Sequence, residues 1–239
     1  MNIHAHILTW NEEKILPFTL DYYSNICSQI FIYDNMSTDS SDEIFSKYEK
    51  VKVFKWNSNN QFNDGYNMKI KSNAYRNYSR DVDWVIVCDC DEFLYHESLI
   101  DKLSEYKSKG ITVPLIDGHD MMSYNFPVYD GKLITEKIKI GSKTYKPMCK
   151  QIIFDPKLDI DFGVGAHFFK CNKEIKCSDN AELKLLHYKF LGIDYVTYRY
   201  NMLAGRLSEF NKVNKFGVHY FNIPFEYMEK TLEEGYNVI

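Results

Sequence analysis

The chain has 239 residues, a net charge of −4 and an apolar share of 45%. This length is sufficient for one domain with a sizeable core. The negative charge, without a long basic run, argues against bulk nucleic-acid binding, which requires a basic surface. No stretch approaches the roughly 18 apolar residues of a membrane span, and residues 1–14 lack the pattern of a signal peptide. We expect a cytoplasmic globular protein, with peripheral attachment at the inner membrane face left open.

Six cysteines are present, and none belongs to a Cys-x-x-Cys pair with the spacing of a metal site. We therefore expect reduced thiols, as in cytosolic proteins. Cys88 and Cys90 lie two residues apart around the end of a predicted strand. This spacing favours one shared packed face, and metal binding by the pair is the less common alternative.

Strands and helices alternate through the first half of the chain. We predict strands over 3–8, 29–33, 51–55 and 84–88, and helices over 13–25, 41–48 and 66–78. Ser40 and Glu43 fit a capping box at the start of the second helix. The alternation predicts an α/β fold with a mixed, mostly parallel sheet flanked by helices.

The second half is less regular. We predict a short strand over 111–115, a long loop or hairpin over 116–132, and strands over 134–140 and 151–154. Residues 161–169 are glycine-rich, and the segment 183–207 begins extended and becomes helical from about Asp194. The tail is predicted to end in a surface helix.

Polar side chains follow three of the four strands of the first half. They lie at residues 9–13, 33–41 and 89–93. In open parallel sheets, ligands bind beyond the carboxyl ends of the strands. We therefore expect these three clusters to meet at one binding site.

The third cluster crowds Asp89, Asp91 and Glu92 into four residues after a buried strand. Like charges this close repel unless a cation or solvent compensates them. Mg²⁺ takes one or two carboxylates together with substrate phosphates, and Mn²⁺ accepts carboxylate and imidazole together. Asp89 and Asp91 thus form a half-site that a diphosphate would complete, although an Asp-x-Asp pair alone is a weak signal.

Several segments together resemble glycosyltransferases of the GT-A fold, in the family 2-like and family 92-like groups. They are ILTWNEEKILPFTLDYYSNICSQIFIYDNMSTDSSDEI, DWVIVCDCDEFL, KPMCKQIIF, GAHFF and LLHYKFLGIDYVTYRY. The resemblance spans about residues 3–207 and implies a Rossmann-like domain for nucleotide-diphospho-sugar transfer over 1–239. Its nucleotide-sugar half would cover 1–95, its acceptor and catalytic half 96–207, and a helical tail 208–239.

The resemblance also implies roles for individual residues. The nucleotide would be bound by Thr9, Asn11, Glu12, Asp34, Asn35, Ser37 and Asp89. We add Asp64, which follows the third strand. The metal ion, Mn²⁺ or Mg²⁺, would be held by Asp89, Asp91 and His187, the last within LLHY. A histidine packed on a strand is the alternative for His187.

The catalytic base is less clear, because the Glu-Asp pair that usually supplies it in family 2 is absent. Asp120, His167 and Asp117 are the candidates, since a base must be a carboxylate or an imidazole near the acceptor hydroxyl. Two further pairs of cations could reach phosphate, although a surface role is the simpler interpretation for each. They are Lys146 with Lys150, and Arg199 with Arg206.

The predicted function is metal-dependent transfer of a sugar from a nucleotide-diphosphate donor, with a UDP-sugar favoured. The acceptor would be a hydroxyl of a glycan or a lipid-linked oligosaccharide, and the resemblance favours inversion. A nucleotidyltransferase is one alternative, but it would show a glycine-rich, basic loop after the first strand, whereas residues 9–14 read TWNEEK. A non-catalytic nucleotide- or sugar-binding module is the other.

Overall fold

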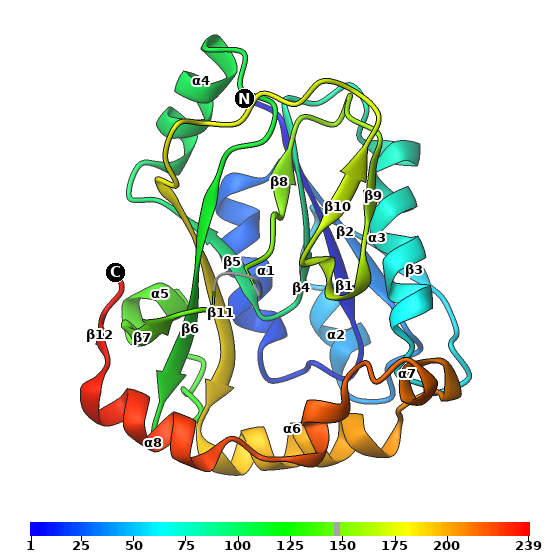
Figure 1. The fold of residues 1–239 in the computed structure, drawn as a ribbon, viewed down its shortest axis with the longest axis vertical. Helices are drawn as coiled ribbons and strands as arrows, with labels where there is room; N and C mark the ends of the chain where they lie inside the picture. Colours follow the sequence, from blue (N-terminus) through cyan, green and yellow to red (C-terminus); the bar gives the residue numbers. More distant parts are fainter. Residues whose placement is uncertain (146–148) are drawn as a thin grey trace.

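The computed structural model describes residues 1–145 and 149–239, and Figure 1 shows its ribbon. In this part of the chain, one five-stranded sheet has the order β3-β2-β1-β4-β8. Its strands are β1 (Ile3–Thr9), β2 (Gln29–Asp34), β3 (Val51–Lys55), β4 (Trp84–Asp89) and β8 (Ile153–Phe154). The first four run parallel and β8 is antiparallel to β4. All four strands predicted in the first half are confirmed. Strands β1, β2 and β4 are largely buried, as expected of near-continuous apolar runs, whereas β3 is a partly exposed edge strand.

Three helices follow strands of this sheet, namely α1 (Leu16–Ile26), α2 (Ser41–Phe45) and α3 (Asp64–Tyr78). Pro17 lies in the first turn of α1, where no backbone donor is lost. Asn63 caps α3 by accepting a hydrogen bond from the Tyr66 amide at 3.2 Å. The predicted capping box of α2 does not form, because the Ser40 backbone is not extended. Asp39 instead accepts the Ser41 amide at 3.1 Å.

A second five-stranded sheet has the order β12-β7-β6-β11-β5. Its strands are β5 (Glu92–Tyr95), β6 (Ile116–Ser123), β7 (Ile140–Lys143), β11 (Leu183–Leu191) and β12 (Tyr236–Asn237). The strand β11 runs parallel to β6 and antiparallel to β5. The extended start of the segment 183–207 is therefore confirmed.

Three predictions for the second half are wrong. Residues 111–115 form only an isolated bridge at Val113, because Pro114 cannot donate to a ladder. Of the two alternatives predicted for 116–132, a long loop or a hairpin, the long loop is wrong, because the segment begins with β6. The predicted strand 134–140 opens with the helix α5 (Ile134–Lys137), where the Glu136 carboxylate accepts the Leu133 amide at 3.3 Å.

The remaining elements surround the two sheets. They are α4 (Leu99–Ser108), the hairpin strands β9 (Ile160–Phe162) and β10 (Phe169–Cys171), the short turn η2 (Val164–Ala166), α6 (Ile193–Gly205), α7 (Glu209–Val213), η3 (Val218–Phe221) and α8 (Phe225–Glu234). In Figure 1, α8 and α6 cross the lower edge beneath the carboxyl ends of β6 and β11, and α7 lies farther to the right, below α3. Within the described residues, no helix is both long and apolar enough to cross a membrane.

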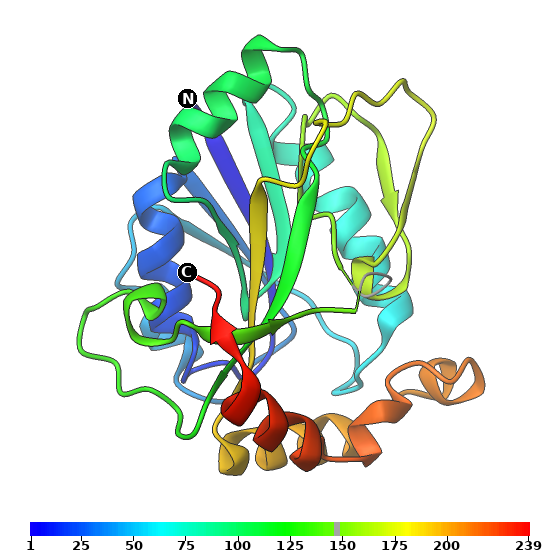
Figure 2. The ribbon, with the colours of Figure 1, turned by 60° about the vertical axis from the view of Figure 1, so that its left-hand side comes forward.

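The two sheets share one apolar core, which extends from Ile7 and Ile86 of the first to Phe93 and Leu186 of the second. Figure 2 shows the sheets from the side, with α1 and α4 covering one flank. The chain passes from the first sheet to the second through a short link, since β4 ends at Asp89 and β5 begins at Glu92. The acidic cluster predicted at a strand end is therefore the junction between the sheets.

The cysteines beside this junction are packed in the core. Cys88 and Cys90 are buried in one apolar cluster, which confirms their shared packed environment. Their thiols lie 3.7 Å from the hydroxyls of Tyr23 and Thr19. All six cysteines are free thiols.

Candidate active site

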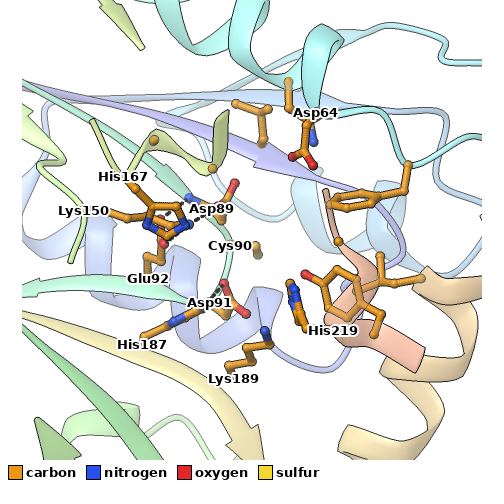
Figure 3. Close-up of a pocket in the computed structure, with 18 of the residues that line it drawn as sticks. Asp64, Asp89, Cys90, Asp91, Glu92, Lys150, His167, His187, Lys189 and His219 are labelled. Atoms are coloured by element: carbon orange, nitrogen blue, oxygen red, sulfur yellow. Dashed lines mark hydrogen bonds and ion pairs between the residues drawn. The ribbon is translucent and has the colours of Figure 1, made fainter. Parts of the chain in front are cut away.

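A cavity of about 860 Å³ lies at the carboxyl ends of the strands, and Figure 3 shows part of its lining. The strands β1, β4, β6 and β11 contribute to it, and α6 and η3 close one side. Nine of the residues predicted for the site line it: Thr9, Glu12, Asn35, Asp64, Asp89, Asp91, Asp120, His167 and His187. Tertiary structure thus gathers candidates from both halves of the chain around one space.

Asp89 is held by two lysines. Its Oδ1 atom lies 2.7 Å from Lys71 Nζ, and its Oδ2 atom lies 2.7 Å from Lys150 Nζ. Lys150 also contacts the buried carboxylate of Glu92 at 2.5 Å. Burial alone would raise the pKa of Asp89, but the two ammonium groups outweigh burial and hold that pKa well below its ordinary value. The four side chains form a balanced ion cluster in the wall of the cavity.

Asp91 faces a different partner. Its Oδ1 atom lies 3.5 Å from Nε2 of His187, and Nδ1 of the same imidazole lies 3.6 Å from Oδ1 of Asp120. Figure 3 shows Asp91 and His187 turned toward each other. Burial lowers the pKa of His187, but the two carboxylates outweigh burial and raise that pKa to about 9. The imidazole is therefore fixed in orientation by one carboxylate on each nitrogen.

Asp91 and His187 fit a divalent cation of the Mg²⁺ or Mn²⁺ type. Ligand distances near 2.1 Å place neighbouring ligands of one ion about 3 to 3.5 Å apart, and the observed spacing of 3.5 Å is in this range. Both side chains keep part of their surface open to the cavity. Asp89 fits less well, since its two oxygens already contact ammonium groups. No group of three or more His, Cys, Asp or Glu side chains among the described residues is arranged to hold a metal ion.

The loop after β1 is tied to α6 by an ion pair between Glu12 and Arg199. Thr9 Oγ1 and Glu12 Oε2 are buried, and neither has a hydrogen-bond partner among the described residues. Buried polar atoms normally have a partner. The two atoms therefore mark a part of the cavity wall that is suited to a polar ligand.

Three residues predicted to bind the nucleotide lie outside the described cavity lining. Asp34 is buried and pairs with Lys55 Nζ at 2.6 Å. The Ser37 hydroxyl accepts the Asn11 amide at 2.8 Å, and the Ser37 amide donates to Asp34 at 3.0 Å. These contacts hold the loops after β1 and β2 together, so the polar groups described here are engaged within the protein.

Asn35 and Asp64 line the cavity with their polar groups engaged. Asn35 exchanges two hydrogen bonds with Ser58, at 2.8 and 3.0 Å. Asp64 accepts a hydrogen bond from Asn211 Nδ2 at 2.9 Å. Burial, together with the charge of Asp89, raises the pKa of Asp64. Asn35 thus connects the cavity wall to the loop at Ser58, and Asp64 connects it to α7.

The three candidate bases have different environments. Asp117 pairs with Lys143 Nζ at 2.9 Å and is not part of the described cavity lining. Asp120 accepts a hydrogen bond from the Tyr227 hydroxyl at 2.9 Å. Burial raises the pKa of Asp120, but His187 and Tyr227 outweigh burial and lower it. His167 lines the cavity beside the glycine turn η2.

Sequence comparison identifies the family of the chain. Residues 5–170 match the sequence model of glycosyl transferase family 2. The chain belongs to this family. The match confirms the predicted GT-A fold and the predicted glycosyltransferase, and it favours that activity over a nucleotidyltransferase or a non-catalytic module.

Solved structures similar to this family 2 enzyme include TarS of S. aureus. Residues 1–349 of TarS are 17% identical, with 96% of this chain and 73% of that chain covered and a TM-score of 0.48. For the same TarS segment in complex with UDP-GlcNAc, the identity is 15%, the coverage 96% and 74%, and the TM-score 0.47. A comparison with curated proteins found no match.

Several residues of the glycosyltransferase cavity were not predicted from the sequence. They are Lys71, Lys189, Tyr195, Tyr200, Tyr220 and Tyr227. Lys71 is buried in α3, within a stretch of lysines and polar residues that reads as a surface helix. Arg199 and Arg206, for which a solvated face was the simpler interpretation, both line the cavity. Lys146 lies outside the described residues, whereas Lys150 is part of the cavity wall.

Proposed function

We propose that this glycosyltransferase uses a nucleoside diphosphate sugar as donor, an acceptor hydroxyl as nucleophile, and a divalent cation held by Asp91 and His187. The observation that carries the proposal is the pairing of these two side chains, 3.5 Å apart, at the junction of the two sheets. Family membership supports sugar transfer. A cation held by two side chains would still need further oxygen ligands, and phosphate oxygens are suited to that role.

The donor nucleotide is proposed to bind at the β1 side of the cavity. Thr9 Oγ1 and Glu12 Oε2 have no hydrogen-bond partner among the described residues. The hydroxyl of Thr9 can donate or accept a hydrogen bond, and the carboxylate oxygen of Glu12 can accept one, so both could bind ribose or base groups. Trp10 and Trp56 line the same cavity and add flat apolar surface. A UDP-sugar is the favoured donor, in agreement with the resemblance of the nucleotide loops.

Sugar transfer requires stabilisation of the departing diphosphate and removal of the acceptor proton. A bound Mg²⁺ or Mn²⁺ would neutralise part of the diphosphate charge as a Lewis acid. The ion cluster keeps Lys71 and Lys150 beside the same space. Their charge is balanced by Asp89 and Glu92, so they would contribute N–H donors for phosphate oxygens and no net positive charge.

Asp120 is proposed to orient His187 rather than to act as the base. A histidine that ligates a metal usually donates its other ring N–H to a carboxylate, and Asp120 lies at that nitrogen. A lowered pKa also makes Asp120 a weak proton acceptor.

His167 is the proposed base. It lines the cavity, and Gly165 makes room for its ring, because a Cβ atom at position 165 would lie 2.6 Å from the imidazole. Inversion would follow from direct attack of the deprotonated acceptor. A glycan or a lipid-linked oligosaccharide is the proposed acceptor class.

The proposal is tested by incubating the enzyme with UDP-, GDP-, CDP- and dTDP-sugars and Mn²⁺, with water as the acceptor of the sugar, and by measuring the release of nucleoside diphosphate. One donor class is expected to react, and Asp91→Asn should slow the reaction roughly 100-fold or more. Asp117→Asn is the matched control, since this aspartate lies outside the described cavity lining and should leave the rate unchanged. Equal rates for the wild type and Asp91→Asn, or no reaction with any donor, would overturn the proposal.

A further inference from the structure

Lys189 occupies the cavity two residues after His187 on β11. The pairing of β11 with β6 is irregular between His187 and Phe190, and both side chains line the cavity. Figure 3 shows Lys189 pointing toward the space between Asp91 and His219. The ammonium group is thus next to the pair that is suited to a divalent cation.

Aromatic rings enclose this ammonium group. Its Nζ atom lies 5.6, 5.2 and 5.0 Å from the ring centroids of Phe190, Tyr200 and Tyr220. The rings come from β11, α6 and η3, so three separate elements hold the lysine in place. Cation–π contacts of this kind stabilise a desolvated cation and still leave its N–H donors available.

Several other cations of the cavity have carboxylate partners, whereas Arg206, which lies over the Trp10 ring, forms no ion pair with a carboxylate of the described residues. Lys71 and Lys150 pair with Asp89, and Arg199 pairs with Glu12. Lys189 forms no ion pair with any carboxylate of the described residues, although Asp91 and Asp120 are near enough to influence it. Lys189 is half-buried, and a cation withdrawn from water without an ion-pair partner costs free energy unless an anion binds there. The lysine is therefore positioned for a ligand.

We propose that the Lys189 ammonium group binds the diphosphate of the donor and holds it as it departs. This inference rests on the proposed function. A phosphate oxygen bound beside Asp91 and His187 would be adjacent to the ammonium, and a hydrogen bond between two charged groups is strong in a site that excludes water. The aromatic enclosure fixes the lysine in advance, so little side-chain entropy is lost on binding. An anionic group of the acceptor is the other ligand that the same chemistry would attract, and the experiment separates the two.

The test is a calorimetric titration with Mn²⁺ and, in the absence of acceptor, UDP, GDP, CDP or dTDP. The diphosphate that binds the wild type most tightly is then compared with its nucleoside. For Lys189→Met, the diphosphate Kd should rise roughly 10- to 100-fold, while the Kd of the nucleoside should stay within about twofold of wild type. Lys170→Met, on the exposed strand β10, is the matched control and should bind both as wild type does.

Thermal unfolding without ligand distinguishes binding from a structural role. Removing a half-buried cation that has no ion-pair partner among the described residues should leave the Tm of Lys189→Met unchanged or higher. Lys189→Gln, which keeps a polar head, provides a second variant if the methionine variant does not fold. An unchanged diphosphate Kd in both variants would overturn the inference and leave the proposed function intact, and would assign the lysine to the acceptor or to structure. If none of the four diphosphates bound the wild type, the proposed function would fail, and this inference with it.

Discussion

Nδ1 of His187 lies 3.6 Å from a carboxylate oxygen of Asp120, on the side of the ring opposite Asp91. The strands β6 and β11 are paired here with Asp120 directly beside His187. The register of the second sheet therefore sets the orientation of the imidazole.

Replacing Asp120 is expected to weaken cation binding. In Asp120→Asn, the charge that orients the imidazole is lost, and the Kd for Mn²⁺ in the presence of nucleoside diphosphate should rise about 10- to 100-fold. Isothermal titration measures this change. Asp117→Asn, three residues earlier on β6, is the control and should bind as wild type does. An unchanged Kd in Asp120→Asn would exclude the orienting role.

His167 is expected to affect turnover and not binding. His167→Gln removes the proposed base, so kcat should fall roughly 100- to 10,000-fold, the range of general base catalysis. Its Kd for nucleoside diphosphate with Mn²⁺ should match wild type. The two values come from a rate assay and a titration on the same preparation. Full activity of the variant would remove His167 from the mechanism.

The ion cluster at the junction of the sheets is expected to contribute to stability. In Lys150→Met, the fully buried Glu92 loses its ion-pair partner, which should lower the free energy of unfolding by about 3 kcal/mol. Urea denaturation measures the loss. The double variant Lys150→Met/Glu92→Gln should recover part of it, because no buried charge is then unpaired at position 92. Wild-type stability in the single variant would contradict this account of the cluster.

His6 is expected to make the protein sensitive to acid. Burial lowers its pKa from 6.5 to about 3, and its ring nitrogens contact Ser79 and Tyr33 at 2.6 and 3.1 Å. The folded state binds this proton less readily than the unfolded chain. Neutral His6 therefore contributes fully to the free energy of unfolding above pH 6.5, and its contribution declines as the pH falls toward 3. At pH 5 the loss is about 2 kcal/mol.

The measurement is urea denaturation at pH 7 and pH 5 for the wild type and His6→Gln. The wild type should lose about 2 kcal/mol more than the variant between these two values. The difference between the two proteins isolates His6 from other titrating groups. Parallel losses would show that His6 does not cause the acid sensitivity.

The first sheet was predictable from the sequence because β1, β2 and β4 are buried runs of apolar residues. The strand β6 was not, since Asp117, Gly118, His119 and Asp120 give it the composition of a loop. Pairing with β11 on one side and β7 on the other makes it a strand. This long-range pairing has no local signal.

Some residues of the site could also be predicted from the sequence, and others could not. Asp89 and Asp91 follow a recognisable strand, and His187 lies in a segment with a family resemblance. The ion pair between Asp89 and Lys71 could not be predicted, because Lys71 lies in a helix whose composition is typical of a surface element. The role proposed for Lys189 also depends on Tyr200 and Tyr220, whose positions follow only from the packing of α6 and η3 against β11.

The central claim is that Asp91 and His187 hold a divalent cation together with the diphosphate of the donor. It is tested most directly by titrating the nucleoside diphosphate into wild type and Asp91→Asn, each with Mn²⁺ and with EDTA. Tight binding by wild type only in Mn²⁺, and weak binding by Asp91→Asn in both conditions, is the predicted result. Equal affinity of the two proteins in Mn²⁺, or equal affinity of the wild type with and without the ion, would contradict the claim.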